Sequence, residues 1–242
     1  MLIPAEASTR VRAVPWSAGT ARIAMIPSVR DRNRVLATIR SAFRDTEHPG
    51  DTFLQGSFEG TEPREVAEAF SGVREWSQLD TAVLDAHYAA LGFLSDGGFR
   101  FFLPAYLVAD LEGGLQTADP VFYLTHGFSD DVPSAAAGSR THDRRIEKST
   151  FVNPRRFGAM TWYDYARKRL SVFTREEAGA VVSYLEYRRD LDTEAIDVQA
   201  IEAALESFWY ERATSAPDHA ALRRDIEAGD AYVRDLTAPP EQ

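Results

Sequence analysis

Apolar residues recur at helical spacing along most of this chain. Between residues 29 and 44, one side of a helix would carry Val35, Leu36, Ile39 and Phe43, as is typical of a helix that packs on a core. The same spacing predicts further helices over 64–70, 77–94, 96–112, 161–170, 174–189, 194–213 and 217–236.

The segment 77–94 has the pattern of one amphipathic helix. Ser77 and Asp80 have the spacing of a capping box, with Asp in place of Glu or Gln. His87 projects from the centre of the apolar face, where it is either a packed side chain or a proton shuttle. That face consists of Leu79, Val83, Leu84 and Leu91.

Residues 96–112 form the densest apolar stretch, and Pro104 lies near its middle. The stripe made by Phe99, Phe102, Leu103, Tyr106 and Leu107 passes the proline without changing phase. An internal proline costs about 3 kcal/mol, chiefly through a lost hydrogen bond and a ring clash. The freed carbonyl belongs to Arg100, which we expect on the outer, hydrated side. We therefore predict one bent core helix.

Two later helices have clear start signals. Thr161 precedes Asp164 by three residues, and Thr174 with Glu177 forms a full capping box. We expect the buried face of the second of these helices to contain Ala178, Val181, Val182 and Leu185.

The remaining segments lack helical periodicity. Residues 1–28 are irregular apart from a possible strand at 21–27, and 47–63 is a loop by its glycine and proline content. Residues 113–160 form a long irregular segment with a strand-like run at 121–125. The chain is therefore expected to be mainly α, with a single domain of seven or eight helices over 29–242 and at most a minor strand pair.

Three segments together resemble sequence blocks of a family of uncharacterised bacterial proteins, a domain of unknown function. They are FSGVREWSQLDTAVLDAHYAALGFLS (70–95), FRFFLPAYL (99–107) and RLSVFTREEAGAVVSYLEYRR (169–189), within a likeness over roughly 35–190. The resemblance implies a helical architecture and no particular activity. Relatives often have cysteines before the segment that matches Val66–Phe70. This chain has LQGSFEGTEP there, so no metal or redox role follows from the likeness.

Charge is distributed unevenly. Residues 140–169 hold nine Lys and Arg against three Asp and Glu, a net charge of +6, within a chain of net charge −10. An acidic body disfavours extended nucleic-acid binding, since phosphate repulsion acts over most of its surface. The absence of cysteine and of a long apolar run predicts a cytoplasmic protein that neither forms disulfides nor enters a membrane.

The basic belt, residues 140–169, is the strongest candidate binding site in the sequence. Arginine suits carboxylates and phosphates, and neighbouring aromatic rings can stack on a ligand. The alternative is that these arginines pair with the acidic helices of the chain itself. The candidate binding residues are Arg140, Arg144, Arg145, Arg155, Arg156, Trp162 and Tyr163.

A catalytic interpretation rests on fewer residues. His126, His142 and Asp143 could bind a divalent metal or act as acid and base in a hydrolase, although no metal-ligand motif joins them. Asp110 is a further candidate, because a carboxylate on an apolar stripe needs a partner. No nucleotide-binding or nucleophile motif occurs, and we expect no bound metal and no cofactor.

The balance of these observations favours a non-enzymatic binding protein, without excluding an enzyme. Its partner would be another protein or a small anionic ligand at the basic belt. Toxin-neutralising proteins are one compatible class. A further alternative is a homo-oligomeric structural protein with Phe101 and the 194–213 helix at its interface.

Overall fold

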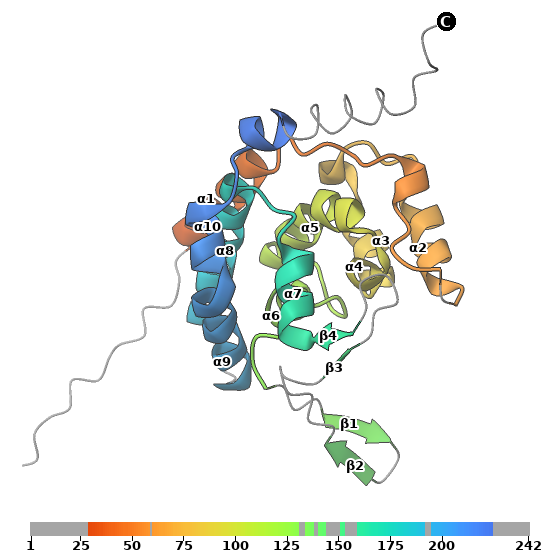
Figure 1. The fold of residues 1–242 in the computed structure, drawn as a ribbon, viewed down its shortest axis with the longest axis vertical. Helices are drawn as coiled ribbons and strands as arrows, with labels where there is room; N and C mark the ends of the chain where they lie inside the picture. The colour runs from red at the N-terminus through yellow and green to blue at the C-terminus, as the bar shows by residue number, and fades with distance from the viewer. Residues whose placement is uncertain are drawn as a thin grey trace, which may run out of the picture.

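The proline-containing apolar stretch forms helix α5, Asp96–Leu111, in the middle of a set of surrounding helices (Figure 1). The computed structural model describes residues 29–58, 60–130, 134–137, 140–143, 151–152, 159–191 and 195–224. The chain is mainly helical and forms a single domain, which confirms the predicted fold class.

Helix α5 continues through Pro104, as predicted. Its N-cap is Ser95, whose hydroxyl accepts a hydrogen bond from the Gly98 amide at 3.0 Å. The prediction that the other side of this helix faces water is wrong, however, because Pro104 and Phe101 are buried as well. Arg100 also points at protein rather than water, since its guanidinium pairs with a buried carboxylate of α8. Helix α5 is thus buried over most of its surface, whereas a helix at the edge of a core is buried on one face only.

Helix α8 packs against two other helices beside α5. Helix α8 (Arg175–Leu191) contacts both α1 (Val29–Ala42) and α10 (Tyr210–Ser215), and α1 also contacts α5. The α1 stripe predicted from the sequence is confirmed by the burial of Val35, Leu36, Ile39 and Phe43.

The C-terminal helices differ from a plain α-helix in one detail. Helix α9 (Ala195–Ala204) runs through a π-helical turn, Leu205–Trp209, directly into α10. The helix predicted over 194–213 is therefore confirmed, with an extra turn geometry that periodicity does not reveal. Residues 219–224 begin another helix. The rest of the predicted 217–236 helix, like the possible strand at 21–27, lies outside the described residues.

The segment between α1 and α5 folds into short pieces on the side of α5 that lies away from α1, α8 and α10 (Figure 1). The α-helices there are α2 (Glu62–Phe70), α3 (Thr81–Ala86) and α4 (Ala90–Phe93), with 3₁₀ turns at Asp51–Phe53 and Trp76–Gln78.

The single helix predicted over 77–94 is wrong. Asp80 is extended and caps α3 by accepting a hydrogen bond from the Ala82 amide at 2.7 Å, so the capping box at Ser77 does not form. Helix α3 ends at His87, whose carbonyl accepts a hydrogen bond from the Tyr106 hydroxyl at 2.9 Å. The His87 ring is half-buried against Phe70, with the ring centroids 5.8 Å apart. Local capping and a tertiary hydrogen bond outweigh the continuous apolar spacing here.

The strand expected at 121–125 is also wrong, because these residues form helix α6, Pro120–Thr125. Asp119 caps it by accepting a hydrogen bond from the Phe122 amide at 3.2 Å, and Pro120 occupies the first turn. A capping Asp followed by Pro is a strong helix start, and it overrides the β preference of Val, Phe and Tyr. Helix α6 places this part of the irregular segment beside α5.

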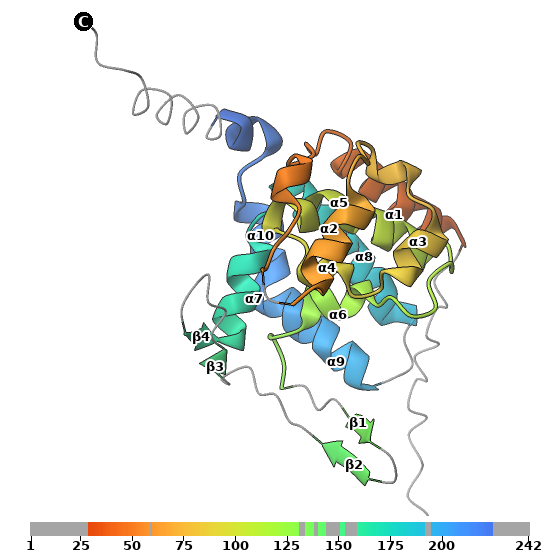
Figure 2. The same ribbon diagram turned by 90° about the vertical axis from the view of Figure 1, so that its right-hand side faces the viewer.

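Strands are a minor part of the fold. β1 (Ser134–Ala137) pairs antiparallel with β2 (Arg140–Asp143), and β3 (Phe151–Val152) pairs antiparallel with β4 (Met160–Thr161). β4 leads directly into α7 (Trp162–Leu170), whose predicted cap is confirmed by a 3.1 Å hydrogen bond from the Asp164 amide to the Thr161 hydroxyl. In both views the β1–β2 pair lies outside the helical body (Figures 1 and 2).

Candidate functional site

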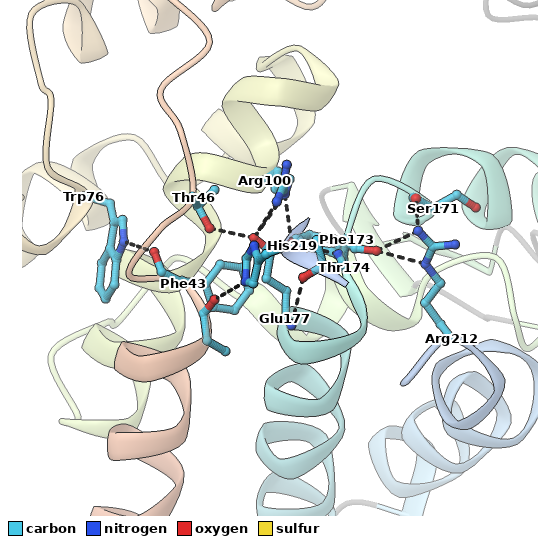
Figure 3. Close-up of polar contacts among 11 residues, drawn as sticks. Phe43, Thr46, Trp76, Arg100, Ser171, Phe173, Thr174, Glu177, Arg212 and His219 are labelled. Atoms are coloured by element: carbon cyan, nitrogen blue, oxygen red, sulfur yellow. Dashed lines mark hydrogen bonds and ion pairs between the residues drawn. The ribbon is translucent and has the colours of Figure 1, made fainter. Parts of the chain in front are cut away.

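Two places in the fold gather chemically distinctive side chains, and the first is a buried polar cluster around Glu177 (Figure 3). The Glu177 side chain has no solvent exposure. Its Oε1 accepts from the Thr46 hydroxyl at 2.6 Å and from Arg100 at 2.9 Å, and its Oε2 accepts from Arg100 at 2.8 Å and from the Thr174 amide at 2.8 Å. Helix α5, the start of α8 and the chain after α1 thereby meet at one carboxylate.

The same region holds further side-chain bonds to backbone carbonyls (Figure 3). The Trp76 indole donates to the Phe43 carbonyl at 3.1 Å, and Arg212 of α10 donates to the carbonyls of Phe173 and Ser171. These bonds satisfy carbonyl groups at the ends of α1 and α7. Because both Glu177 oxygens already have donors, the Glu177 cluster has the character of a structural clamp.

The second place is an aromatic pocket of about 240 Å³ between α4, α6 and α7. We call it the aromatic pocket throughout. Its lining is formed by Gly92, Phe99, Phe122, Tyr123, His126, Trp162, Tyr165, Ala166, Arg169 and Leu170.

The rings of the aromatic pocket contact one another in sequence along its wall. The Phe122 ring stacks on His126 at a centroid distance of 4.7 Å, and His126 meets Trp162 edge to face at 4.8 Å. Trp162 in turn contacts Tyr165 at 5.6 Å. Burial raises the pKa of the Tyr123 hydroxyl, so this group stays protonated and neutral at physiological pH.

The α7 side of the pocket follows from helical spacing. Trp162, Tyr165, Ala166 and Arg169 stand at intervals of three and four residues, so they share one face of α7. The α6 side is brought close by Gly127, which has φ of +95°. A Cβ there would lie 2.8 Å from the Trp162 carbonyl oxygen, a contact that only glycine avoids.

Arg169 forms part of the pocket wall, but its guanidinium is already occupied. It pairs with Asp96 at 2.8 Å and donates to the carbonyls of Leu91 and Leu94 at 2.8 and 2.9 Å. It also lies over the Phe99 ring, 4.7 Å from the centroid. The pocket therefore presents mainly aromatic surface, with its one lining arginine neutralised by a carboxylate.

The opposite face of α7 serves packing. Tyr163 meets Phe128 edge to face at 5.8 Å. Arg167 donates to the Ser207 carbonyl at 2.9 Å, within the π-helical turn, and lies over the Phe208 ring. The two neighbouring aromatic residues predicted as binding residues are thus separated: Trp162 lines the aromatic pocket and Tyr163 packs inward.

The other predicted binding residues lie largely beyond the described part of the chain. Arg140 lies in β2, and Arg144, Arg145, Arg155 and Arg156 lie outside the described residues. Asp130 follows α6 closely and β4 directly precedes α7, so the segment between them begins and ends near the α6 and α7 walls of the pocket.

The candidate catalytic residues fall in different places. His126 lines the aromatic pocket, whereas His142 and Asp143 lie in β2, outside the helical body. Among the described residues, no group of three or more His, Cys, Asp or Glu side chains could hold a metal ion. The hydrolase interpretation stays a prediction, and trace-metal analysis of the native chain and of His142→Ala tests it.

Asp110 has the partners that its apolar surroundings require. Its carboxylate accepts from the Tyr184 hydroxyl and from Arg188, each at 2.6 Å. Burial, followed by the nearby Asp110 charge, raises the pKa of Tyr184 well above its usual value, so the phenol remains a donor. These contacts give Asp110 a structural role, because they join α5 to α8.

Several pocket residues were not identified from the sequence. Phe122 and His126 are four residues apart, and this spacing would have placed them on one face if 121–125 had been recognised as a helix. Tyr165 lies three residues after Trp162, and this helical spacing could have identified it from the sequence. The contact of α6 with α7 has no sequence signal apart from Gly127.

Comparison with known proteins gives a family but no activity. Across the described residues, no helix combines the length and apolar character needed to cross a membrane. No curated protein and no solved structure matches the chain. Residues 31–213 match the family described as "Family of unknown function (DUF6714)". The match covers most of the chain and spans both α5 and α8, as the resemblance implied, and this protein therefore belongs to the DUF6714 family of unknown function.

Proposed function

We propose that this protein is a non-enzymatic binding protein, and that its aromatic pocket receives one apolar side chain from an acidic segment of a partner protein. The observation that carries the proposal is the pocket itself, a concave aromatic surface whose α7 wall belongs to the basic belt. Partner side chains inserted into such pockets commonly dominate the energy of protein–protein association.

The size of the pocket supports a side chain rather than a whole small molecule. Its volume is about 240 Å³, below the range of about 300–1,000 Å³ that is usual for small-molecule sites. A phenylalanine or similar ring fits such a space and can meet the edges and faces of Phe122, His126 and Trp162.

The charge around the pocket supports an acidic partner. Arg169, which lines the pocket, is neutralised by Asp96, so an inserted ring needs no charge of its own. The belt 140–169 carries a net charge of +6 and is joined to the pocket at Trp162. The positive charge of this belt therefore favours a partner segment that carries carboxylates over one that carries cations.

The test uses a short fluorescein-labelled peptide in which one phenylalanine is flanked by aspartates and glutamates. Fluorescence anisotropy should detect its binding to the full chain. Replacement of the peptide phenylalanine by serine should weaken binding about tenfold or more, and replacement of the acidic residues by lysines should abolish it.

Protein variants identify the site. Phe122→Ser removes a half-exposed ring at the pocket rim and should weaken peptide binding without loss of folding, since Phe122 is 47% exposed. Tyr210→Ser, an exposed ring on α10, is the matched control and should bind normally. Equal affinity of the native chain and Phe122→Ser, or no binding of the acidic peptide at all, would refute the proposal.

A further inference from the structure

We infer that the side chain received by the aromatic pocket is Phe58 of a second copy of this chain, in a two-fold symmetric dimer. This inference rests on the proposed function, because it names the partner that uses the same pocket. It draws on three observations: an exposed ring on a braced loop, an acidic segment opposite in charge to the basic belt, and the closeness of that loop to the pocket on one molecule.

Phe58 is the most exposed large apolar residue among those described, at 86%. The backbone just before it is fixed: the Gly56 amide donates to the Phe93 carbonyl at 2.9 Å, and the Ser95 amide donates to the Leu54 carbonyl at 2.7 Å. A Cβ at Gly56 would lie 2.5 Å from the Leu94 carbonyl oxygen, so this stretch packs closely against the end of α4. The backbone next to this exposed phenylalanine is therefore fixed, which lowers the entropic cost of a contact made through it.

The segment that carries Phe58 is acidic. Residues 45–68 hold seven Asp and Glu against one Arg, a net charge of −6, which equals the belt in size and is opposite in sign. Within it Asp51 pairs with Arg74 at 2.7 Å, while the side chains of Glu47, Glu62 and Glu65 are exposed. Phe58 is thus an exposed ring in an acidic segment, which is the kind of segment that the proposed function assigns to the pocket.

The loop that carries Phe58 and the acceptor pocket both adjoin α4. Gly92 lines the pocket, and the next residue, Phe93, holds the Phe58 loop through the bond to Gly56. The loop that carries Phe58 and the pocket are therefore neighbours on one molecule. A surface that is complementary to itself pairs across a two-fold axis, with the same insertion made twice and no open end for further growth.

Sedimentation velocity and light scattering over a range of protein concentrations test the inference. The native chain should form a dimer and nothing larger. Phe58→Ser and Trp162→Ala should each shift the midpoint of dimerisation to a concentration about tenfold higher or more. Tyr210→Ser should dimerise like the native chain, and circular dichroism should show that all variants are folded.

A mixture of the two variants gives the sharpest result. In a mixed dimer the intact Phe58 of the Trp162→Ala chain can enter the intact pocket of the Phe58→Ser chain, so one of the two insertions is restored. The mixture should therefore form a heterodimer more readily than either variant forms a homodimer. Heterodimers no more stable than the homodimers would overturn the inference.

The outcomes also separate this inference from the proposed function. A chain that stays monomeric, or a dimer that Phe58→Ser leaves unchanged, overturns the inference. If the acidic phenylalanine peptide still binds in a Phe122-dependent way, the proposed function stands and a different protein supplies the ring. If neither the peptide nor a second copy binds, both are rejected.

Discussion

The Glu177 cluster and the aromatic pocket differ in how completely their side chains are paired with other groups of the protein. Around Glu177, a buried charge has a donor at each oxygen, and three parts of the fold contribute them. In the aromatic pocket, rings line an open space and the one lining arginine is paired with Asp96. Buried polar groups that are fully paired hold a fold together, whereas concave apolar surface that is left open is available to a partner.

This difference indicates separate roles for the two regions, although their sequences are similar in kind. Both contain arginine and aromatic residues close to a capped helix start. Substitution in the Glu177 cluster should change stability and leave binding intact, while substitution in the aromatic pocket should do the reverse.

The largest expected effect is on stability. Glu177→Ala leaves Arg100 buried without its carboxylate and removes the acceptor of Thr46, so the free energy of unfolding should fall by about 3–5 kcal/mol. Urea unfolding followed by circular dichroism measures this loss. At a temperature where the variant is folded, binding of the acidic peptide should be unchanged.

The neighbouring residue is a matched control for that prediction. Glu176 is 40% exposed and lies 3.8 Å from Arg175, so Glu176→Ala should change stability by no more than about 0.5 kcal/mol. Similar losses in Glu177→Ala and Glu176→Ala would show that the Glu177 cluster is not a clamp.

A smaller effect links stability to the pocket. Gly127→Ala forces a side chain into a left-handed conformation and against the Trp162 carbonyl, at a cost of about 1–3 kcal/mol. Gly72→Ala has nearly the same backbone conformation, with φ of +82°, but a Cβ there meets nothing within 4 Å. The excess loss in Gly127→Ala over Gly72→Ala measures the α6–α7 contact, and only Gly127→Ala should weaken peptide binding.

The smallest effect concerns pH. His48 packs edge to face on Phe101 at 4.9 Å, and its Nδ1 accepts from the Gly50 amide at 2.9 Å. Burial, and then the charge of Arg74, hold the pKa of His48 below its usual value of 6.5. As the pH falls below about 6.5, the unfolded chain gains a proton before the folded chain does, so stability decreases until the lower folded pKa is reached.

Urea midpoints at pH 7.5 and pH 5.5 test this effect in the native chain and in His48→Gln. The native chain should lose more stability on acidification than the variant, because the variant lacks the group that titrates. An equal loss in both would show that His48 does not contribute to the pH dependence.

Sequence patterns predict the long helices of this fold well. α1, α5, α7 and α8 each have an apolar stripe or a clear cap, and Thr161 and Thr174 cap their helices as expected. The apolar stripe of α5 keeps one phase across Pro104, and the structure confirms the continuous helix that this pattern predicts. These signals are local, so one sequence contains them.

The errors arise where tertiary contacts or competing local signals decide. The segment 77–94 keeps helical spacing, but Asp80 caps a later start and the Tyr106 hydroxyl takes the carbonyl of His87. At 121–125 the residue types favour a strand, and the Asp119–Pro120 start overrides them.

The aromatic pocket could be predicted only in part. Trp162 and His126 were identified as separate candidates, and helical periodicity could have added Tyr165. Their convergence depends on the approach of α6 to α7, which is set by packing around Gly127 and by Arg167 reaching the π-helical turn. No spacing within either helix contains that information.

The π-helical turn also sets the register of the last helix. It accommodates one residue more than an α-helix of the same rise, and each residue turns a helix by about 100°. If the residues 205–209 formed a plain α-helix instead, Tyr210–Ser215 would be rotated by about that angle around the helix axis. Arg212 would then face away from the carbonyls of Ser171 and Phe173 that it now reaches. The π-helical turn therefore determines that Arg212 faces the end of α7 and holds its last carbonyl groups.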